Sequence, residues 1–464
     1  MVVKKILKSS KSRTILLSAL LIGAVPTMNV ALADLTATKY PAAETYKPTP
    51  IPDRIILSWK GDTATTQAVS WRTDVNVVTP QAQIAVAEDG PAFKAKAKTV
   101  MAESSSEVKG NQPYTAKFHT VNFENLNPST KYLYRVGDGV NWSEWFEFST
   151  ASDKSEPFSF LYVGDAQNDI LEHWSRVIRN AYSDLPDAKF IIHAGDLINH
   201  GDADEQWGEW FKAGGWLNGM VSSIPTPGNH EYSKIVKGEP SGLSQYWRPQ
   251  FALPENGPTG FEETVYYTDY QGMRIISLDT NVKGSNLDKQ VAWLEQVLEN
   301  NPNKWTVITF HHPIYANSPG RDNVEVRNKL LPLIEKYSVD LVLQGHDHSY
   351  ARGHVTNKAS GQNAMSTKSD TVFVVSVSGP KMYDFTSKNW DENGAQVRNA
   401  IKDTQLYQLV RVNGDTLSYE ARTATGNLFD GFEINKTPSG QKQIKETTNT
   451  QWEKEKQEEK NAKN

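Results

Sequence analysis

The chain contains no cysteine among its 464 residues. This absence excludes disulfide bonds, a lipid anchor attached to cysteine, and thiolate ligands for a metal. Any bound metal ion must therefore be held by oxygen and nitrogen atoms. Export without disulfides is typical of a protein of the bacterial envelope or of a protein that bacteria secrete.

The chain also lacks a marked excess of charge of either sign. Its 49 basic and 54 acidic residues give a formal net charge of −5, which offers no basic surface for nucleic acid or for an anionic membrane. No apolar run reaches the roughly 20 residues that a membrane-spanning helix needs. We therefore expect no nucleic-acid partner and no membrane span in the mature chain.

Residues 1–33 have the features of a signal peptide. Basic residues from Lys4 to Arg13 precede the apolar run ILLSALLIGAV, and residues 31–33 read ALA, a small-x-small cleavage pattern. We predict a mature chain that begins at Asp34 and is exported to a bacterial periplasm or to the outside of the cell.

A Pro-rich lead at residues 34–54 precedes a run of short strands that we place at residues 55–150. Alternating apolar and polar residues with turn signals between short strands are typical of an antiparallel β-sandwich. The segment LNPSTKY at residues 126–132 resembles the tyrosine corner of fibronectin type III domains. Trp59 and Trp71 are the expected core aromatics of this fibronectin III-like, all-β domain.

A linker at residues 151–157 leads to a second domain at residues 158–435. Apolar strands alternate there with amphipathic helices, which indicates an α/β fold. Strand-like segments between residues 371 and 423 predict a second sheet, so we expect a four-layer domain with a two-sheet core. Residues 436–464 are polar and rich in lysine and glutamate, which predicts a disordered tail.

Five predicted strands of the second domain are followed directly by side chains that can bind a metal. These are Asp165, Asp196, Asn229 with its neighbour His230, His311, and the pair His346 and His348. The carboxyl ends of strands build the sites of open α/β sheets, so we expect these side chains to converge. In the segment LQGHDHSY, His346 and His348 project to the same side because they are two residues apart in an extended chain.

This donor set combines carboxylate, amide and imidazole groups. It suits Fe, Zn or Mn better than Mg or Ca, because it is rich in imidazole. Six protein ligands exceed what one such ion needs while it keeps an open position. We therefore predict two divalent or trivalent ions about 3.5–4 Å apart with a carboxylate between them, and the metal pair stays open.

The motifs GD, GD, GNHE, HxP and GHxH follow one another along the second domain. Their order and spacing resemble those of the calcineurin-like metallophosphoesterases, and the leading sandwich makes the chain similar to a bacterial purple acid phosphatase over roughly residues 50–435. The resemblance implies that Asp165 and His348 bind the first metal and that Asp196 bridges both. The residues implied for the second metal are Asn229, His311 and His346.

The resemblance also implies roles in catalysis and in substrate binding. Asp196 would act in catalysis as the bridging ligand. His230 would contact the phosphate together with Asn229 and would protonate the leaving oxygen, a task that suits an imidazole with a pKa near 6.5. Arg321 follows His311 by ten residues, where plant relatives place substrate-contacting histidines, and could clamp phosphate oxygens. A surface ion pair is the alternative for this arginine.

Two positions depart from the purple acid phosphatase pattern. That family has a glycine two residues after the first aspartate and a ligating tyrosine three residues after the second, where this chain has Gln167 and Asn199. Gln167 is therefore a further candidate ligand through its amide oxygen. Without the tyrosinate, a preference for Fe(III) loses its basis, and we expect a colourless protein.

The leading hypothesis is an exported, acid phosphatase-like enzyme that scavenges phosphate. It would hydrolyse phosphate monoesters with a metal-activated hydroxide, and its partners would be small phosphorylated substrates. One alternative is hydrolysis of phosphodiesters or nucleotides at the same site. Another is a catalytically weak envelope-binding protein that uses the β-sandwich. The sequence leaves the oligomeric state open.

Overall fold

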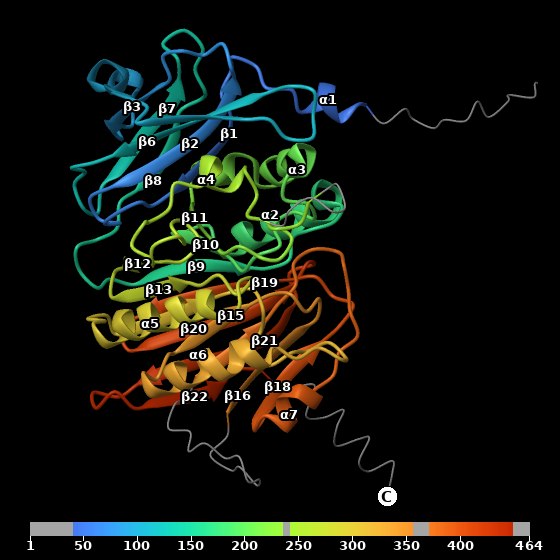
Figure 1. The fold of residues 1–464 in the computed structure, drawn as a ribbon. Coiled ribbons are helices and arrows are strands. Elements are labelled where there is room, and N and C mark those ends of the chain that lie inside the picture. The colour runs from blue at the N-terminus through green and yellow to red at the C-terminus, as the bar shows by residue number, and fades with distance from the viewer. Residues whose placement is uncertain (1–39, 235–241, 356–370, 449–464) are drawn as a thin grey trace, which may run out of the picture. The chain divides into compact units, whose positions relative to one another are not determined.

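The computed structural model describes residues 40–234, 242–355 and 371–448 (Figure 1). The predicted signal peptide, residues 1–33, and the last part of the predicted tail lie outside these ranges, so both stay predictions. Within the described ranges, no helix combines the length and the apolar character that crossing a membrane requires.

Two four-stranded antiparallel sheets form the N-terminal β-sandwich. Their strand orders are β1 (Asp53–Ser58), β2 (Gln67–Asp74), β6 (Ala116–Phe123), β5 (Ser104–Val108) and β4 (Lys98–Met101), β3 (Gln81–Val86), β7 (Lys131–Gly137), β8 (Phe146–Ser149). Sequence analysis missed β4 and β5, because these edge strands expose most of their side chains and show little apolar alternation. The sandwich starts at Asp53, inside the predicted lead, which also holds α1 (Ala42–Thr45).

The aromatic residues predicted for the sandwich are buried. The Tyr132 hydroxyl accepts a hydrogen bond from the backbone N–H of Asn127 at 2.9 Å, as a tyrosine corner requires. Trp71 lies in the sandwich core, and Trp59, also buried, packs against Phe190 of the second domain at a ring distance of 6.0 Å. The prediction of a sandwich core residue is confirmed for Trp71 and wrong for Trp59, which belongs to the core of the second domain because it directly follows β1 and lies against that domain.

Two seven-stranded sheets form the second domain. The first has the order β11 (Ser222–Pro225), β10 (Phe190–His193), β9 (Phe158–Val163), β19 (Leu406–Asn413), β20 (Thr416–Thr423), β21 (Leu428–Lys436), β22 (Lys442–Glu446). The second has the order β12 (Tyr266–Tyr270), β13 (Met273–Ser277), β14 (Trp305–Thr309), β15 (Leu341–Gln344), β17 (Val372–Val375), β16 (Tyr350–Val355), β18 (Ala395–Ile401). Strands β9 to β11 are parallel, as are β13, β14, β15 and β17.

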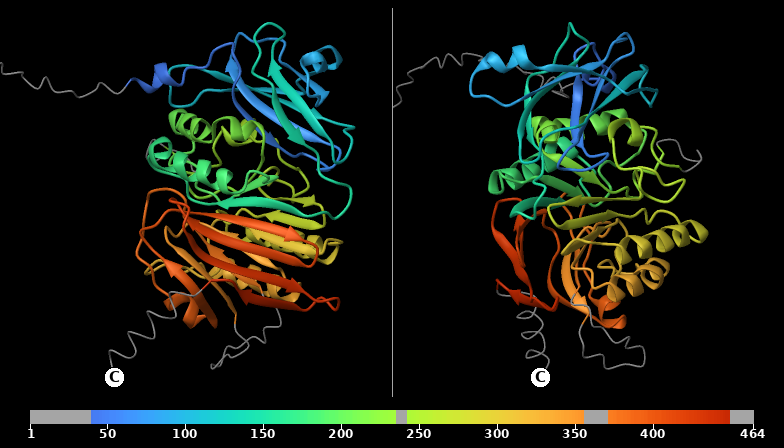
Figure 2. Two further views of the ribbon diagram at one scale, coloured as in Figure 1. Left: turned by 180° about the vertical axis from the view of Figure 1, so that it is seen from behind. Right: turned by 90° about the vertical axis from the view of Figure 1, so that its left-hand side faces the viewer.

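The two sheets pack face to face between layers of helix. Along β14 and β15, Val307 and Leu343 belong to the core shared with the first sheet, whereas Ile308 and Val342 pack with the helices. This division follows from the alternation of side chains along a strand. Figure 2 shows α5 and α6, in yellow and orange, on the outer side of the second sheet. The predicted α/β domain with a two-sheet core is confirmed.

The described part of the second domain also contains several α-helices. They are α2 (Ser175–Asp184), which continues a π-helical turn at Ile170–Trp174, α3 (Asp204–Gly214), α4 (Trp247–Gln250), α5 (Ser285–Glu299), α6 (Val324–Lys336) and α7 (Lys388–Glu392). Short 3₁₀ turns lie at Pro91–Lys96 and Gly215–Gly219. Helix α2 packs on β19, and α3 packs on α2 and on β1 of the sandwich.

The prediction that the late strands form a sheet of their own is wrong. Strand β17 runs parallel to β15, and β19 pairs antiparallel with β9, so each sheet combines early and late strands of the domain. The predicted tail also begins too early, because β22 pairs with β21. Within β22, Glu446 meets the buried guanidinium of Arg352 at 2.6 Å. The polar composition of residues 436–464 predicts disorder. Residues 442–446 are ordered instead, because the charge of Glu446 pairs with Arg352, which lies far away in the chain.

A buried carboxylate joins the sandwich to the second domain. Asp204, at the start of α3, accepts hydrogen bonds from Arg54 at 2.8 and 2.9 Å and from Arg72 at 3.2 Å. The Tyr114 hydroxyl donates a further bond at 2.8 Å. Both guanidinium groups and the carboxylate are almost fully buried. Arg54 therefore depends on Asp204 for compensation of its charge, whereas Arg72 also pairs with Asp53 at 2.6 Å.

We expect Asp204→Asn to destabilise the protein by about 3–5 kcal/mol, because it leaves the buried Arg54 without its counter-charge, while Arg72 keeps its ion pair with Asp53. Thermal unfolding followed by circular dichroism measures the loss. Glu147→Gln is the matched control, since Glu147 and Lys131 form an exposed pair at 3.0 Å and such pairs contribute about 1 kcal/mol or less. Equal melting temperatures for the two variants would contradict a central role for Asp204.

Candidate metal centre

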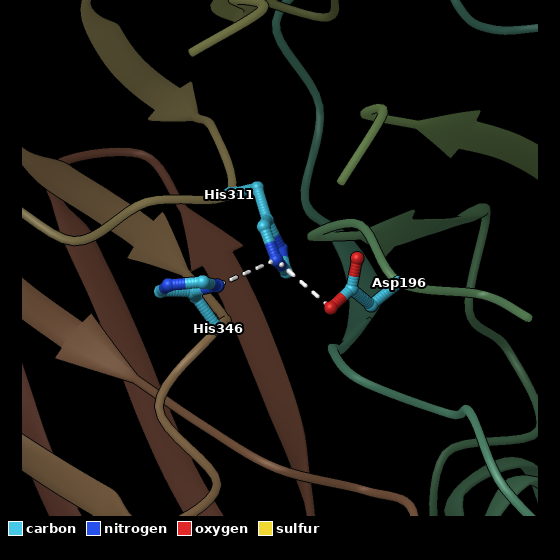
Figure 3. A group of neighbouring side chains, drawn as sticks. All are labelled: Asp196, His311 and His346. Atoms are coloured by element: carbon cyan, nitrogen blue, oxygen red, sulfur yellow. Dashed lines mark hydrogen bonds and ion pairs between the residues drawn. The ribbon is translucent and has the colours of Figure 1, made fainter. Parts of the chain in front are cut away.

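The predicted ligands converge at the carboxyl ends of strands from both sheets. Asp165 follows β9 and Asp196 follows β10 in the first sheet, while His311 follows β14 in the second. The pair His346 and His348 follows β15 of the second sheet. Figure 3 shows the side chain of Asp196 facing those of His311 and His346. The site therefore lies where the two sheets meet.

Two groups of donors share one carboxylate. Asp196 lies with His311 and His346 in one group and with Asp165 and His348 in the other, and in each group the donor atoms lie within 4.8 Å of one another. His311 Nε2 is 3.1 Å from Asp196 Oδ2, and His348 Nε2 is 3.6 Å from Asp165 Oδ1. Four of these five side chains are at most 1% exposed, and His346 is partly buried.

Asn229 completes the second group. Its Oδ1 lies 2.9 Å from His346 Nδ1 and 3.1 Å from His311 Nε2. The structure thus brings together the six residues that were predicted as ligands. The sequence placed these residues on separate strands, and the facing sheets supply the contact between them.

Backbone carbonyl groups orient the histidines. His311 Nδ1 lies 2.9 Å from the carbonyl oxygen of Ala194, and His348 Nδ1 lies 2.9 Å from that of Lys381. A carbonyl oxygen only accepts, so each Nδ1 carries the proton and each Nε2 presents a lone pair to the centre. Lone pairs and carboxylates that face one another in a buried site require a cation between them. The donor set therefore fits bound metal ions.

The charges of the centre are unbalanced. Burial raises the pKa of Asp165 well above its ordinary value, and His311 offsets this only in part. Burial would also raise the pKa of Asp196, but His311 holds it below its ordinary value. Burial lowers the pKa of His311, yet Asp196 outweighs burial and raises it to about 9. In the absence of metal, a protonated His311 thus faces two buried carboxyl groups; bound cations would displace the Nε2 proton of His311 and supply the missing positive charge.

The glycines before the ligands allow the close approach of the loops. A Cβ on Gly345 would lie 2.4 Å from Asp165 Oδ2, and a Cβ on Gly195 would lie 2.6 Å from His311 Nδ1. The backbone of Asp196 itself has a φ of 52°, a strained value for a residue other than glycine. A larger residue in place of Gly195 or Gly345 would collide with a neighbouring ligand, which explains the glycine of the second GD motif and of the GH motif.

Gln167 lies between the two donor groups. Its Nε2 is 2.9 Å from His348 Nε2 and 3.4 Å from Asp196 Oδ2. Within the described residues, its buried Oε1 has no hydrogen-bond partner. Rotation of the amide by 180° exchanges the two atoms and turns the oxygen toward the donors. This orphaned oxygen is consistent with the predicted role of Gln167 as a further ligand.

Arg321 is held by the ligand loop. Its Nη1 donates to the carbonyl oxygen of His346 and to the carboxylate of Asp347, each at 2.7 Å. Asp347 is fully buried, so the alternative of a surface ion pair does not describe this contact. Asp347 also accepts the backbone N–H of Asn317 at 2.5 Å. The ion pair of Arg321 with Asp347 fixes the loop that carries His346. The other guanidinium nitrogens of Arg321 stay available for the predicted contact with phosphate.

Sequence analysis missed a supporting carboxylate. Glu231, the last residue of GNHE, accepts the backbone N–H groups of Asp196, Leu197 and Gly228 at 2.9, 2.8 and 2.6 Å. It thereby ties the loop after β10 to the loop after β11. Its position beside the candidate ligand Asn229 is the signal that could have identified it, but only the fold shows where its oxygens point.

A pocket of about 590 Å³ opens beside the second donor group. Its lining includes Asn229 and His346 of that group together with Tyr232, His312 and Lys283. His312 Nδ1 lies 2.9 Å from the Thr280 hydroxyl oxygen. The pocket gives a small solute access to the donor atoms.

Comparison with known proteins agrees with this fold and site. Residues 52–150 match the model of the purple acid phosphatase N-terminal domain, and residues 158–350 match the model of the calcineurin-like phosphoesterases. An uncharacterized protein of Mycobacterium tuberculosis is 26% identical over 359 residues, which are 68% of this chain and 66% of that protein. Human acid phosphatase type 7 is 28% identical over 334 residues, 66% of this chain and 71% of that protein.

Two solved structures share the fold. The purple acid phosphatase of yellow lupin seeds has a TM-score of 0.67 at 18% identity, covering 83% of this chain and 74% of that chain. The structure of PhoD has a TM-score of 0.60 at 14% identity, covering 87% and 93%. The facing sheets with a shared-carboxylate donor cluster define a phosphoesterase-type, metal-binding domain. The chain belongs to the calcineurin-like phosphoesterases and carries the N-terminal domain of the purple acid phosphatases.

We expect Asp196→Ala to lose both metal ions, because Asp196 is common to both donor groups. Elemental analysis after purification without chelator measures the content per chain. Asp187→Ala, which changes an exposed aspartate on the same domain, serves as the control and should keep the wild-type content. Wild-type metal content in Asp196→Ala would refute the shared role of this carboxylate.

Proposed function

We propose that this chain is a dinuclear metal-dependent hydrolase of phosphate monoesters, an acid phosphatase-like enzyme. The single observation that carries the proposal is the carboxylate of Asp196, which two groups of nitrogen and oxygen donors share. A carboxylate shared in this way can hold two metal ions close together, and such two-metal sites catalyse the hydrolysis of phosphate esters. The family to which the chain belongs supports the same class of reaction.

Asp165 and His348 would hold one ion, and Asn229, His311 and His346 the other, with Asp196 between them and Gln167 as an additional ligand. Two bound cations would supply an activated water and would withdraw charge from the phosphoryl oxygens. The donors are all oxygen and nitrogen atoms, so we propose Fe, Zn or Mn as the ions.

His230 is the proposed general acid. Its backbone N–H donates to Asp196 Oδ1 at 2.8 Å, and its Nδ1 lies 2.6 Å from the carbonyl oxygen of Asn199. These contacts fix the ring and direct Nε2 toward the centre, 3.9 Å from Asp196 Oδ2. Since Nδ1 donates to a carbonyl oxygen, Nε2 carries a proton when the ring is an imidazolium, and this proton is positioned for transfer to the leaving oxygen of a bound ester. The neutral alcohol then leaves.

Hydrolysis of phosphodiesters is the second candidate function. A pocket of about 700 Å³ adjoins the one beside the metal centre, and Tyr232 lines both. Arg248, Phe261 and Lys289 line the larger pocket. Two pockets next to one phosphate site could accommodate the two organic groups of a diester. Rates on p-nitrophenyl phosphate and on bis(p-nitrophenyl) phosphate distinguish the two functions.

We also propose export of the enzyme, with phosphate scavenging as its role. The basic and apolar composition of residues 1–33 and the absence of cysteine support export to a periplasm or to the medium. The alternative of a binding protein that uses the β-sandwich receives less support, because every predicted ligand reaches the centre. Less than one equivalent of transition metal in the wild-type protein would favour that alternative.

We expect His230→Gln to lower kcat on p-nitrophenyl phosphate by about 10²–10⁴-fold, the usual contribution of a general acid. Metal content should stay at the wild-type level, since the proposed ligands are unchanged. His173→Gln, a substitution of a half-exposed histidine at the start of the first helix of the domain, is the control and should leave kcat unchanged. A wild-type kcat for His230→Gln would exclude the role of His230.

A further inference from the structure

The loop that follows β17 is tied to the metal centre at several points. The backbone N–H of Gly379 donates to the carbonyl oxygen of Asp165, and that of Tyr383 donates to the carbonyl oxygen of His348, each at 2.9 Å. The carbonyl oxygen of Lys381 accepts the Nδ1 proton of His348 at 2.9 Å. Three backbone contacts thus hold residues 379–383 against the first donor group.

The side chain of Lys381 lies close to this group. Its Nζ is 5.4 Å from the centre of the Tyr383 ring, and that ring is 4.6 Å from the ring of His348. Together, these two distances place the ammonium group within about 10 Å of the centre of the His348 ring.

Lys381 belongs to the loop beside the first donor group, whereas Lys283 lines the pocket beside the second. Arg321 lies against the same Tyr383 ring at 4.9 Å, but Asp347 engages its guanidinium. In the part of the chain that the structure describes, no carboxylate comes within ion-pair distance of Lys381 Nζ. An ammonium on the loop that contacts Asp165 and His348, with no carboxylate at ion-pair distance among the described residues, is available to bind an anion.

We propose that Lys381 binds the phosphate group of the substrate and thereby favours phosphate monoesters over phosphodiesters. The inference rests on the proposed function and assigns a substrate-binding residue to the same site. A monoester carries close to two negative charges at neutral pH, because its second pKa lies near 6, whereas a diester carries one. A nearby ammonium therefore stabilises the bound monoester more strongly.

The test uses Lys381→Met in the full chain, which keeps the aliphatic stem against Tyr383 and removes the charge. We expect the inhibition constant of inorganic phosphate and the KM for p-nitrophenyl phosphate to rise about 10-fold or more, the value of a charge-assisted hydrogen bond. The kcat/KM for bis(p-nitrophenyl) phosphate should change by less than about 3-fold. Calorimetric titration of the metal-loaded protein with inorganic phosphate gives a readout independent of turnover.

Two further variants separate binding from structure. Lys381→Arg restores the charge and should recover most of the phosphate affinity. Lys402→Met removes an exposed lysine that pairs with Asp384 at 2.7 Å, one residue beyond Tyr383, and should leave phosphate binding unchanged. Metal content should equal that of the wild type in all three variants.

Several outcomes would overturn the inference. These are phosphate affinity of Lys381→Met within twofold of wild type, equal losses on both esters, a loss of bound metal, or no recovery in Lys381→Arg. A wild-type protein that cleaves neither ester would refute the proposed function, whereas weaker phosphate binding in Lys381→Met would still support the anion contact. The two failures are therefore distinguishable.

Discussion

The charge of the Asp196 carboxylate is the constraint on which the rest of the site depends. This group is 1% exposed, and an ionised carboxylate withdrawn from water needs compensation from its surroundings. The backbone N–H of His230 and the imidazole of His311 supply part of it. The carboxylate of Glu231 accepts the backbone N–H of Asp196 and thereby fixes the backbone of this residue. A site built around one buried anion is a site prepared for cations.

The packing of the two sheets delivers the other ligands to that anion. The aspartates come from strands of the first sheet and the histidines from strands of the second, so neither sheet holds a complete donor group. Late strands secure this arrangement, because β19 pairs with β9 in the first sheet and β17 with β15 in the second. These late strands thus support the geometry of the site, although none of the six predicted ligands lies on them or after them.

Buried charges recur wherever separate parts of the chain must meet. Asp204 joins the sandwich to the second domain through Arg54 and Arg72, and Arg352 holds β22 through Glu446. Asp347 and Arg321 fix the ligand loop. Each pair replaces lost hydration with a specific partner, which favours one arrangement of the elements over others. Lys381 differs from these groups, since its charge is left for a ligand.

The amino-acid sequence alone determined the layers, most strands and the identity of the six donors. Apolar periodicity and position at strand ends are local properties, so the residues from Asp165 to His348 could be named before their contacts were known. Tertiary structure alone decided the edge strands β4 and β5, the ordering of β22, the support from Glu231 and the position of Lys381. These features depend on partners far away in the chain, such as Arg352 for Glu446. Local patterns carry no information about which distant charge a side chain will meet, because burial and pairing arise only when the sheets pack.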